Sequence, residues 1–179
     1  MARMILTGGG NVTDLTALQE RLGGIGIALR RWPVPDAPRV RTLLEKAALD
    51  EPEKEQLLAA VDDRFQTLKR EAGYSTRDLI VIHENIPGLA DMLGKFDKVH
   101  LHTDDEVRYI LAGKGYFGFV EPDGGQFMVE VNAGDYINVP ANAEHWFTLG
   151  DSKRIKAVRY FIDTRGWTPV YTGRAMLFG

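Results

Sequence analysis

The stretch His100-Leu101-His102-Thr103-Asp104-Asp105-Glu106 is the most informative part of this sequence. Alternate residues of a β-strand point to the same face, so His100 and His102 would direct their imidazoles at one point. Glu106 follows after a bend and can return a carboxylate to that point. Two histidines and one carboxylate on one face form a ligand set for Fe(II) or a similar divalent metal. The alternative is a pair of surface histidines on either side of a core leucine.

A third histidine, His145, lies further downstream, just after a predicted strand over 135–139. A single histidine flanked by aromatic residues is more often a packed side chain than a ligand. An antiparallel barrel can nevertheless bring this segment beside the first one. His145 is therefore a candidate third imidazole for the same ion.

Composition narrows the classes of protein. The chain has 179 residues, which is enough for one domain with a buried core. It contains no cysteine, so disulfides, thiolate metal sites and cysteine nucleophiles are excluded. A net charge of −3 argues against a nucleic-acid partner. No apolar run approaches the roughly 18 residues of a membrane span, so we expect no membrane partner and a cytoplasmic protein.

The composition of the chain changes near residue 98. Residues 99–173 are rich in Val, Ile, Tyr and Phe in about seven short runs, with hairpin signals at 113–115 and 122–125. This pattern is typical of a sandwich or barrel. We predict a single domain over residues 1–179, mostly β with N-terminal helices. An antiparallel β-barrel or jelly roll covers 98–173, and the mixed segment 1–97 packs outside it.

Helical patterns predominate before residue 98. Apolar residues recur there at the spacing of amphipathic helices, and glycine or proline residues end the runs. We expect helices over 13–23, 40–48, 51–72 and 86–96, and strands over 25–32 and 78–83.

The spacing of the candidate ligands resembles the two motifs of the cupin family. The first motif is matched at every fixed position by Gly94, His100-x-His102, Glu106 and Gly113. The second is matched at most positions, by Gly134, Pro140 and His145. It departs at Asn142, where the motif usually has Gly, and lacks the Asn that ends the motif. Agreement in order and spacing implies a cupin-type barrel that holds a four-ligand metal site.

Longer segments are similar to the acireductone dioxygenases of the methionine salvage pathway. These segments are Asp104-Asp105-Glu106-Val107-Arg108-Tyr109, His145-Trp146-Phe147, Ala157-Val158-Arg159-Tyr160-Phe161 and Gly166-Trp167. The resemblance spans roughly residues 30–173 and is strongest over 78–167. One departure is Val99, because many bacterial members have an acidic residue directly before the first ligand histidine, where it is thought to help metal loading.

This resemblance implies a metal-dependent dioxygenase. Three imidazoles and one carboxylate leave two positions on a six-coordinate Fe2+ or Ni2+ ion, one ion per chain, for a substrate that chelates through two oxygens. In the family, the iron form reacts with O2 to give formate and 2-keto-4-methylthiobutyrate. The nickel form gives formate, carbon monoxide and methylthiopropionate. Both metals accept these ligands, so the sequence does not select between them. The resemblance also implies a monomer.

Two polar residues near the ligands are candidates for catalysis. Arg108 comes two residues after Glu106, so on a continuing strand it shares that face, and its guanidinium would favour the enediolate dianion. The alternative is a surface arginine paired with Asp104 or Asp105. Asp105 itself is a candidate for holding a histidine ring or coupling to a loop.

Three further residues are candidates for substrate binding. Phe147 and Trp167 would line a pocket for the methylthio end of the substrate, because aromatic rings pack well against sulfur. Arg159, on the predicted strand 155–161, is a similar candidate. Ordinary core packing is the alternative for the two aromatic residues, and a structural role is the alternative for Arg159.

Two other interpretations of the chain stay open at this point. A different metal cupin enzyme, either another dioxygenase or an isomerase of a small hydroxy-keto compound, would keep the same four ligands. A non-enzymatic cupin that binds a small ligand often lacks one or more ligands, whereas all four are present here.

Overall fold

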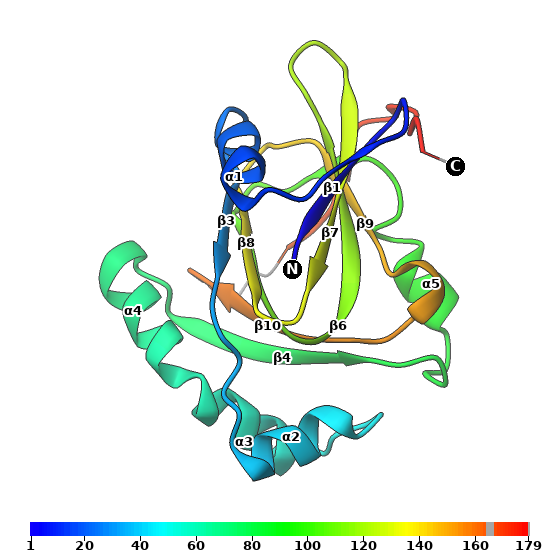
Figure 1. Cartoon of the computed structure of the whole chain (residues 1–179). Helices are drawn as coiled ribbons and strands as arrows, with labels where there is room; N and C mark the ends of the chain where they lie inside the picture. The colour runs from blue at the N-terminus through cyan, green and yellow to red at the C-terminus, as the bar shows by residue number, and fades with distance from the viewer. Residues whose placement is uncertain (164–166, 179) are drawn as a thin grey trace.

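The computed structural model describes residues 1–163 and 167–178, so Gly166 lies outside the described residues. Two antiparallel sheets share one long strand, β6 (Glu106–Val120), and enclose a barrel (Figure 1). One sheet adds β11 (Val170–Tyr171), β5 (His100–Leu101), β9 (His145–Thr148), β7 (Gln126–Asn132), β1 (Arg3–Leu6) and β2 (Asn11–Val12). The other adds β3 (Ala28–Arg31), β8 (Asp135–Val139), β10 (Ile155–Phe161) and β4 (Thr76–Ile82). The predicted antiparallel barrel is confirmed.

Strand β6 passes from one sheet to the other. Up to Gly113 it pairs with β8 and β10, and from Lys114 onward it pairs with β7 and β9. The hairpin predicted at 113–115 is therefore wrong. Gly113 has φ 76° and bends a continuous strand, because a Cβ there would meet the Arg154 carbonyl. The other predicted turn, over 122–125, does connect β6 to β7.

The N-terminal segment contributes strands as well as helices. β1 pairs with β7. The sequence pattern did not predict β1, because its apolar run is short and leads into three glycines. β3 pairs with β8, and β4 pairs with β10 at the edge of the second sheet. Residues 1–97 therefore complete both sheets around the strands of residues 98–173.

In the part of the chain that the structure describes, five α-helices lie outside the barrel (Figure 1): α1 (Leu15–Gly23), α2 (Pro38–Glu45), α3 (Glu51–Ala60), α4 (Asp62–Ala72) and α5 (Leu89–Leu93). The single helix predicted over 51–72 is divided at Val61, where the backbone leaves the helical region at φ −120° and ψ 19°. Asp50 and Glu53 form a capping box at the start of α3. Asp14 caps α1, where its side chain accepts a hydrogen bond from the backbone N–H of Ala17.

Two hydrophobic clusters result from the alternation of side chains along the shared sheet. The inner cluster fills the barrel with residues such as Ile110, Phe117 and Ile137. The outer cluster packs the opposite face of β6, β8 and β10 against α2, α3 and α4, with Tyr109 and Tyr160 at its centre. Because neighbours in sequence take opposite faces, residues 106 and 108 point into the barrel while 107 and 109 point toward the helices.

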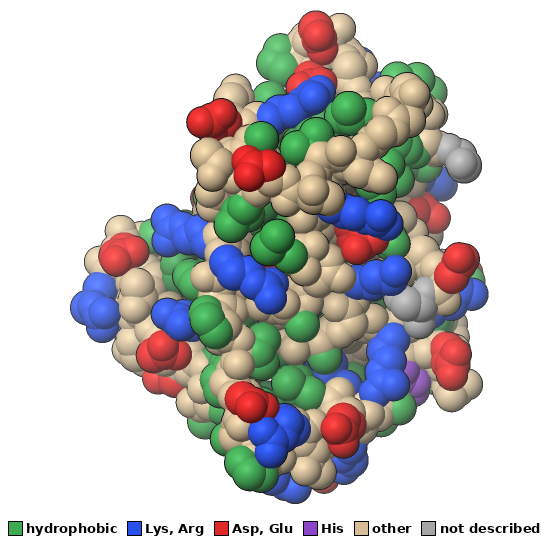
Figure 2. Space-filling view, viewed as in Figure 1, with side chains coloured by type: hydrophobic (Ala, Val, Ile, Leu, Met, Phe, Trp, Pro, Cys, Tyr) green, Lys and Arg blue, Asp and Glu red, His purple; other side chains and the backbone are tan. Residues whose placement is uncertain are grey.

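The surface carries no dominant charge on the face shown in Figure 2. Lys and Arg side chains alternate there with Asp and Glu side chains, and small apolar areas lie between them. This distribution agrees with the small net charge of the chain. Among the described residues, no helix has the length and apolar character that crossing a membrane requires.

Lys156 connects β10 to the end of α2. Its side chain is buried, and its ammonium donates to the carbonyl oxygens of Leu44, at 2.9 Å, and Lys46, at 2.5 Å. These carbonyls lie at the C-terminus of α2, where a cation satisfies unpaired acceptors. Burial, with a smaller contribution from Arg154, lowers the pKa of Lys156 from its ordinary 10.5 to about 8.

We predict that the stability of the wild-type protein, measured relative to Lys156→Met, increases as the pH rises from about 8 to 10.5. In that window the unfolded lysine keeps a proton that the folded lysine has lost, so the free energy of unfolding increases with pH. The gain is on the order of 1–3 kcal/mol. Denaturant unfolding of both proteins at each pH measures it, with the exposed Lys69→Met as control. Burial also raises the pKa values of Tyr74 and Tyr160, but these tyrosines change the free energy of unfolding with pH equally in all three proteins. Parallel pH profiles for the three would contradict the prediction.

Candidate metal centre

Strand pairing brings the four predicted ligands together. His100 on β5 lies directly opposite His145 on β9, and Glu106 begins β6, which pairs with β9 further along. His102 follows β5 by one residue. One ligand atom from each of the four residues lies within 4.8 Å of the others, well inside the 8 Å beyond which no single ion would bridge them. All four side chains are buried, each 1–2% exposed.

Backbone carbonyls orient two of the imidazoles. His100 Nδ1 lies 2.7 Å from the Lys98 oxygen, and His145 Nδ1 lies 2.8 Å from the Ala143 oxygen. A proton on each Nδ1 fixes the tautomer that leaves Nε2 with a free lone pair. Within the described chain, the buried His100 Nε2 has no hydrogen-bond partner. A metal ion is the partner that such an atom lacks, and the donor set of three imidazoles and one carboxylate fits a divalent ion.

The electrostatics of the cluster keep Glu106 and His100 in their metal-binding protonation states. Burial works to raise the pKa of Glu106, but the charge of Arg108 and the close contacts with His102 and His145 outweigh it and hold that pKa well below its ordinary value. Burial lowers the pKa of His100 from 6.5 to about 4. At neutral pH the centre therefore offers a carboxylate and a neutral imidazole, as metal binding requires.

Arg108 lies inside the barrel beside the ligands. It is 4% exposed, and its Nε donates to Glu106 Oε1 at 2.6 Å. Its guanidinium also lies over the rings of Phe147 and Trp167, at 5.1 and 5.3 Å from the ring centroids. The structure thus places Arg108 on the inner face rather than in a surface pair with Asp104 or Asp105.

Asp105 acts at the loop that follows β8. Its Oδ1 accepts a hydrogen bond from the backbone N–H of Ala141 at 3.0 Å, in the segment that leads to His145. The contact couples the two loops that carry ligands. Of the two roles predicted for Asp105, the geometry matches the coupling to a loop.

Phe147 extends from β9 into the barrel next to Arg108. The space for its ring exists because residue 115 is glycine: a Cβ there would lie 2.6 Å from the ring. The backbone N–H of Phe147 donates to the Phe96 carbonyl at 2.7 Å, which holds β9 against the segment after α5.

Trp167 and Arg159 lie on the opposite side of Arg108. The Trp167 ring is 6.3 Å from the His102 ring and 4.7 Å from the Phe161 ring. Arg159 on β10 lies opposite Arg108 on β6, and its guanidinium is 5.6 Å from the Trp167 ring. The predicted substrate residues therefore surround one side of the metal centre.

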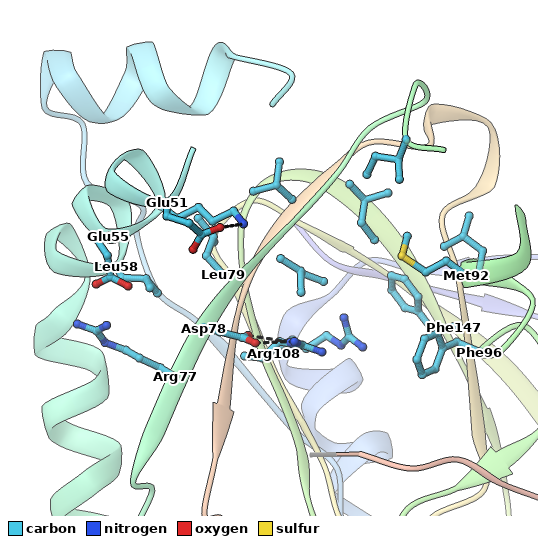
Figure 3. Close-up of a pocket in the computed structure, with 17 residues that line it drawn as sticks. Glu51, Glu55, Leu58, Arg77, Asp78, Leu79, Met92, Phe96, Arg108 and Phe147 are labelled. Carbon is cyan, nitrogen blue, oxygen red and sulfur yellow. Dashed lines mark hydrogen bonds and ion pairs between the residues drawn. The ribbon is translucent and has the colours of Figure 1, made fainter. Parts of the chain in front are cut away.

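A cavity of about 450 Å³ is lined by three of these neighbours of the centre, Arg108, Phe147 and Arg159 (Figure 3). Met92, Phe96 and Phe147 line one end of it, and Arg108 and Asp78 lie near its middle. Glu51, Glu55 and Leu58 of α3 line the far end. Arg108 lines the cavity and contacts Glu106, so this side chain lies between the cavity and the ligand cluster.

The chain is similar to known proteins over nearly its whole length. The profile of the ARD/ARD' family matches residues 35–169. An acireductone dioxygenase from Trichodesmium erythraeum is 48% identical over 178 residues, covering 99% of this chain and 98% of the relative. The chain belongs to the acireductone dioxygenase family. A relative from Leptospira interrogans is 55% identical over 154 residues, covering 86% of this chain and 83% of the relative.

A solved structure from the acireductone dioxygenase family supports the same conclusion. The Bacillus anthracis acireductone dioxygenase, with a cadmium ion in its active centre, superposes with a TM-score of 0.89 at 34% identity. The match covers 96% of this chain and 98% of that one. Membership of the family makes this chain an oxidoreductase with a divalent-metal centre, and disfavours the other cupin interpretations.

Several cavity residues escaped the sequence reasoning. Ile82, Ile86 and Met92 line the cavity, although the sequence marks them only as apolar positions of a strand and a short helix. Asp78 carried one signal, because it is a carboxylate at the start of the apolar run Leu79–Ile82. The three charged residues of α3 that line the cavity, Glu51, Lys54 and Glu55, gave none, because charged residues are expected on an exposed helix.

Proposed function

We propose that the centre binds one Fe(II) or Ni(II) ion through His100, His102, Glu106 and His145. We further propose that the enzyme cleaves 1,2-dihydroxy-3-keto-5-methylthiopentene with O2. The iron form gives formate and 2-keto-4-methylthiobutyrate, and the nickel form gives formate, carbon monoxide and methylthiopropionate. The observation that carries the proposal is the buried cluster of three histidines and one glutamate, with Arg108 in contact with Glu106 and lining the neighbouring cavity together with Phe147.

The residues around the cluster support an anionic oxygen substrate with an apolar end. When bound, the metal supplies Lewis acidity and a template for two substrate oxygens. Arg108, buried and preorganised by Glu106, places positive charge where the enediolate forms. Phe147 and Trp167 offer ring faces to the methylthio group, and Arg159 adds a second cation on the same wall. Barrel walls exclude water from the reacting atoms.

Asp105 is proposed to keep the two ligand-bearing loops in register through Ala141. Val99, buried directly before His100, offers no carboxylate to assist metal loading, and the effect on loading stays a prediction. The monomeric state, the cytoplasmic location and the absence of nucleic-acid or membrane partners also stay predictions from the sequence.

Metal exchange tests the function directly. Metal-free protein is reconstituted with Fe(II) or with Ni(II), and acireductone is added under O2. We expect one ion per chain in both cases, formate from both, the keto acid only from the iron form and carbon monoxide only from the nickel form. No oxygen uptake by either form at full metal occupancy would contradict the proposal.

A further inference from the structure

Three charged residues form a row across the inner wall of the barrel. Asp78 on β4 lies opposite Arg159 on β10, which in turn lies opposite Arg108 on β6. Two arginines opposite one another on neighbouring strands repel each other. Each has its own carboxylate: Arg108 pairs with Glu106, and Arg159 pairs with Asp78.

The Asp78–Arg159 pair has a defined, two-point geometry. Arg159 Nε donates to Asp78 Oδ1 at 2.8 Å, and Nη2 donates to Oδ2 at 2.5 Å. Such a side-on pair fixes the plane of the guanidinium as well as its position. It uses two of the five N–H donors of the arginine and leaves the others for a ligand.

The pair lies between two cavities. The 450 Å³ cavity and a second one of about 320 Å³ share Arg77, Asp78 and Arg159 in their walls. Dashed lines at Asp78 in Figure 3 mark its ion pair with Arg159. An arginine at this position has open space on both sides, and in the described structure Asp78 is its carboxylate partner.

Exposure of the pair argues against a role in stability alone. The side chains of Arg159 and Asp78 are 30% and 46% exposed, and ion pairs this exposed contribute little to folding. The side chains of the other pair, Arg108 and Glu106, are only 5% and 2% exposed. What the exposed pair does provide is a fixed orientation of Arg159, whose guanidinium lies over Trp167 beside the metal centre.

We propose that Asp78 is a positioning residue of the dioxygenase. It fixes the Arg159 guanidinium against Trp167, so that the remaining N–H donors of Arg159 meet the anionic substrate next to Arg108. The inference rests on the proposed function, since it assigns Arg159 to substrate binding. A misplacement of about 1 Å in such a positioned group can reduce turnover on the order of 100-fold.

Steady-state kinetics of metal-loaded variants test the proposal. Asp78→Asn should lower kcat by about 10-fold to 100-fold without raising KM, because Arg159 keeps its charge but loses its orientation. Arg159→Met should lower kcat and raise KM. Adding Asp78→Asn to Arg159→Met should change neither constant further, because the carboxylate acts only through the arginine. Asp78→Glu should restore part of kcat.

A second measurement uses the metal-free protein and does not depend on activity. NMR of the arginine Nε–H groups should show slow exchange with water for Arg159 in the wild type and fast exchange in Asp78→Asn. Asp62→Asn is the matched control, because Asp62 pairs with Arg77, the neighbour of Asp78 on β4, at 2.6 Å. This variant should leave both the Arg159 signal and kcat unchanged.

The outcomes separate the two hypotheses. Unchanged kcat in Asp78→Asn, full additivity with Arg159→Met, or unchanged Arg159 exchange would overturn the positioning role. An inactive wild type with a protected Arg159 Nε–H would instead refute the proposed function while leaving the geometry of the pair intact.

Discussion

Glu106→Ala is expected to abolish metal binding at stoichiometric metal and to reduce acireductone turnover on the order of 1,000-fold or more, since the metal supplies several kcal/mol of charge stabilisation. Glu106 is the only anionic ligand of the four. Its loss also leaves the Arg108 guanidinium in the barrel without its 2.6 Å partner. A buried cation that loses its counter-charge repels a divalent ion as well as destabilising the fold.

The measurement is metal content after gel filtration, followed by oxygen uptake with acireductone. Glu130→Ala provides a matched control, because Glu130 is also a buried glutamate paired with an arginine, Arg3, at 2.9 Å. The control should keep one metal ion per chain and near wild-type activity. A Glu106→Ala protein that retains both metal and activity would show that the metal centre is elsewhere.

The metal ligands of the candidate site could be predicted from the sequence. Strand parity predicted that His100 and His102 share a face, and motif spacing added His145. Their meeting point required the pairing of β5 with β9, which is a long-range contact that a barrel topology implies but spacing alone does not fix. The alternation of side chains along the strand did not decide whether Arg108 lies in the core or on the surface. The pairing of β6 with both β8 and β10 shows that the face of Arg108 is enclosed.

Other features depend on tertiary contacts that leave no local signal. The pair of Asp78 with Arg159 exists only because β4 aligns with β10 in one register, and a shift by one residue would separate the two side chains. The division between α3 and α4 at Val61 is similar, because the outer cluster buries that side chain at the cost of helix continuity. β6 continues through Gly113 because its two halves find partners in different sheets.

Arg108→Ala should leave the metal in place and lower turnover by about 2–4 kcal/mol in transition-state stabilisation, comparable to removing one preorganised donor from an anion site. The four ligands remain, so the ion still has its full donor set. Loss of the guanidinium removes the positive charge that faces the enediolate. Because Arg108 also helps to hold the pKa of Glu106 low, metal content is measured in every sample.

The pH dependence and a conservative variant separate this role from simple packing. The defect of Arg108→Ala should shrink as pH rises, since the substrate then loses its proton without help from a neighbouring cation. Arg108→Lys should recover only part of the rate, because a point charge lacks the planar fork that engages Glu106 and a substrate oxygen together. Arg31→Ala is the matched control, because Arg31 pairs at 2.8 Å with Asp135, which is buried but is not one of the ligand or cavity residues. An alanine variant at 108 with full metal and an unchanged rate at neutral pH would assign the counter-charge of the enediolate to Arg159 alone.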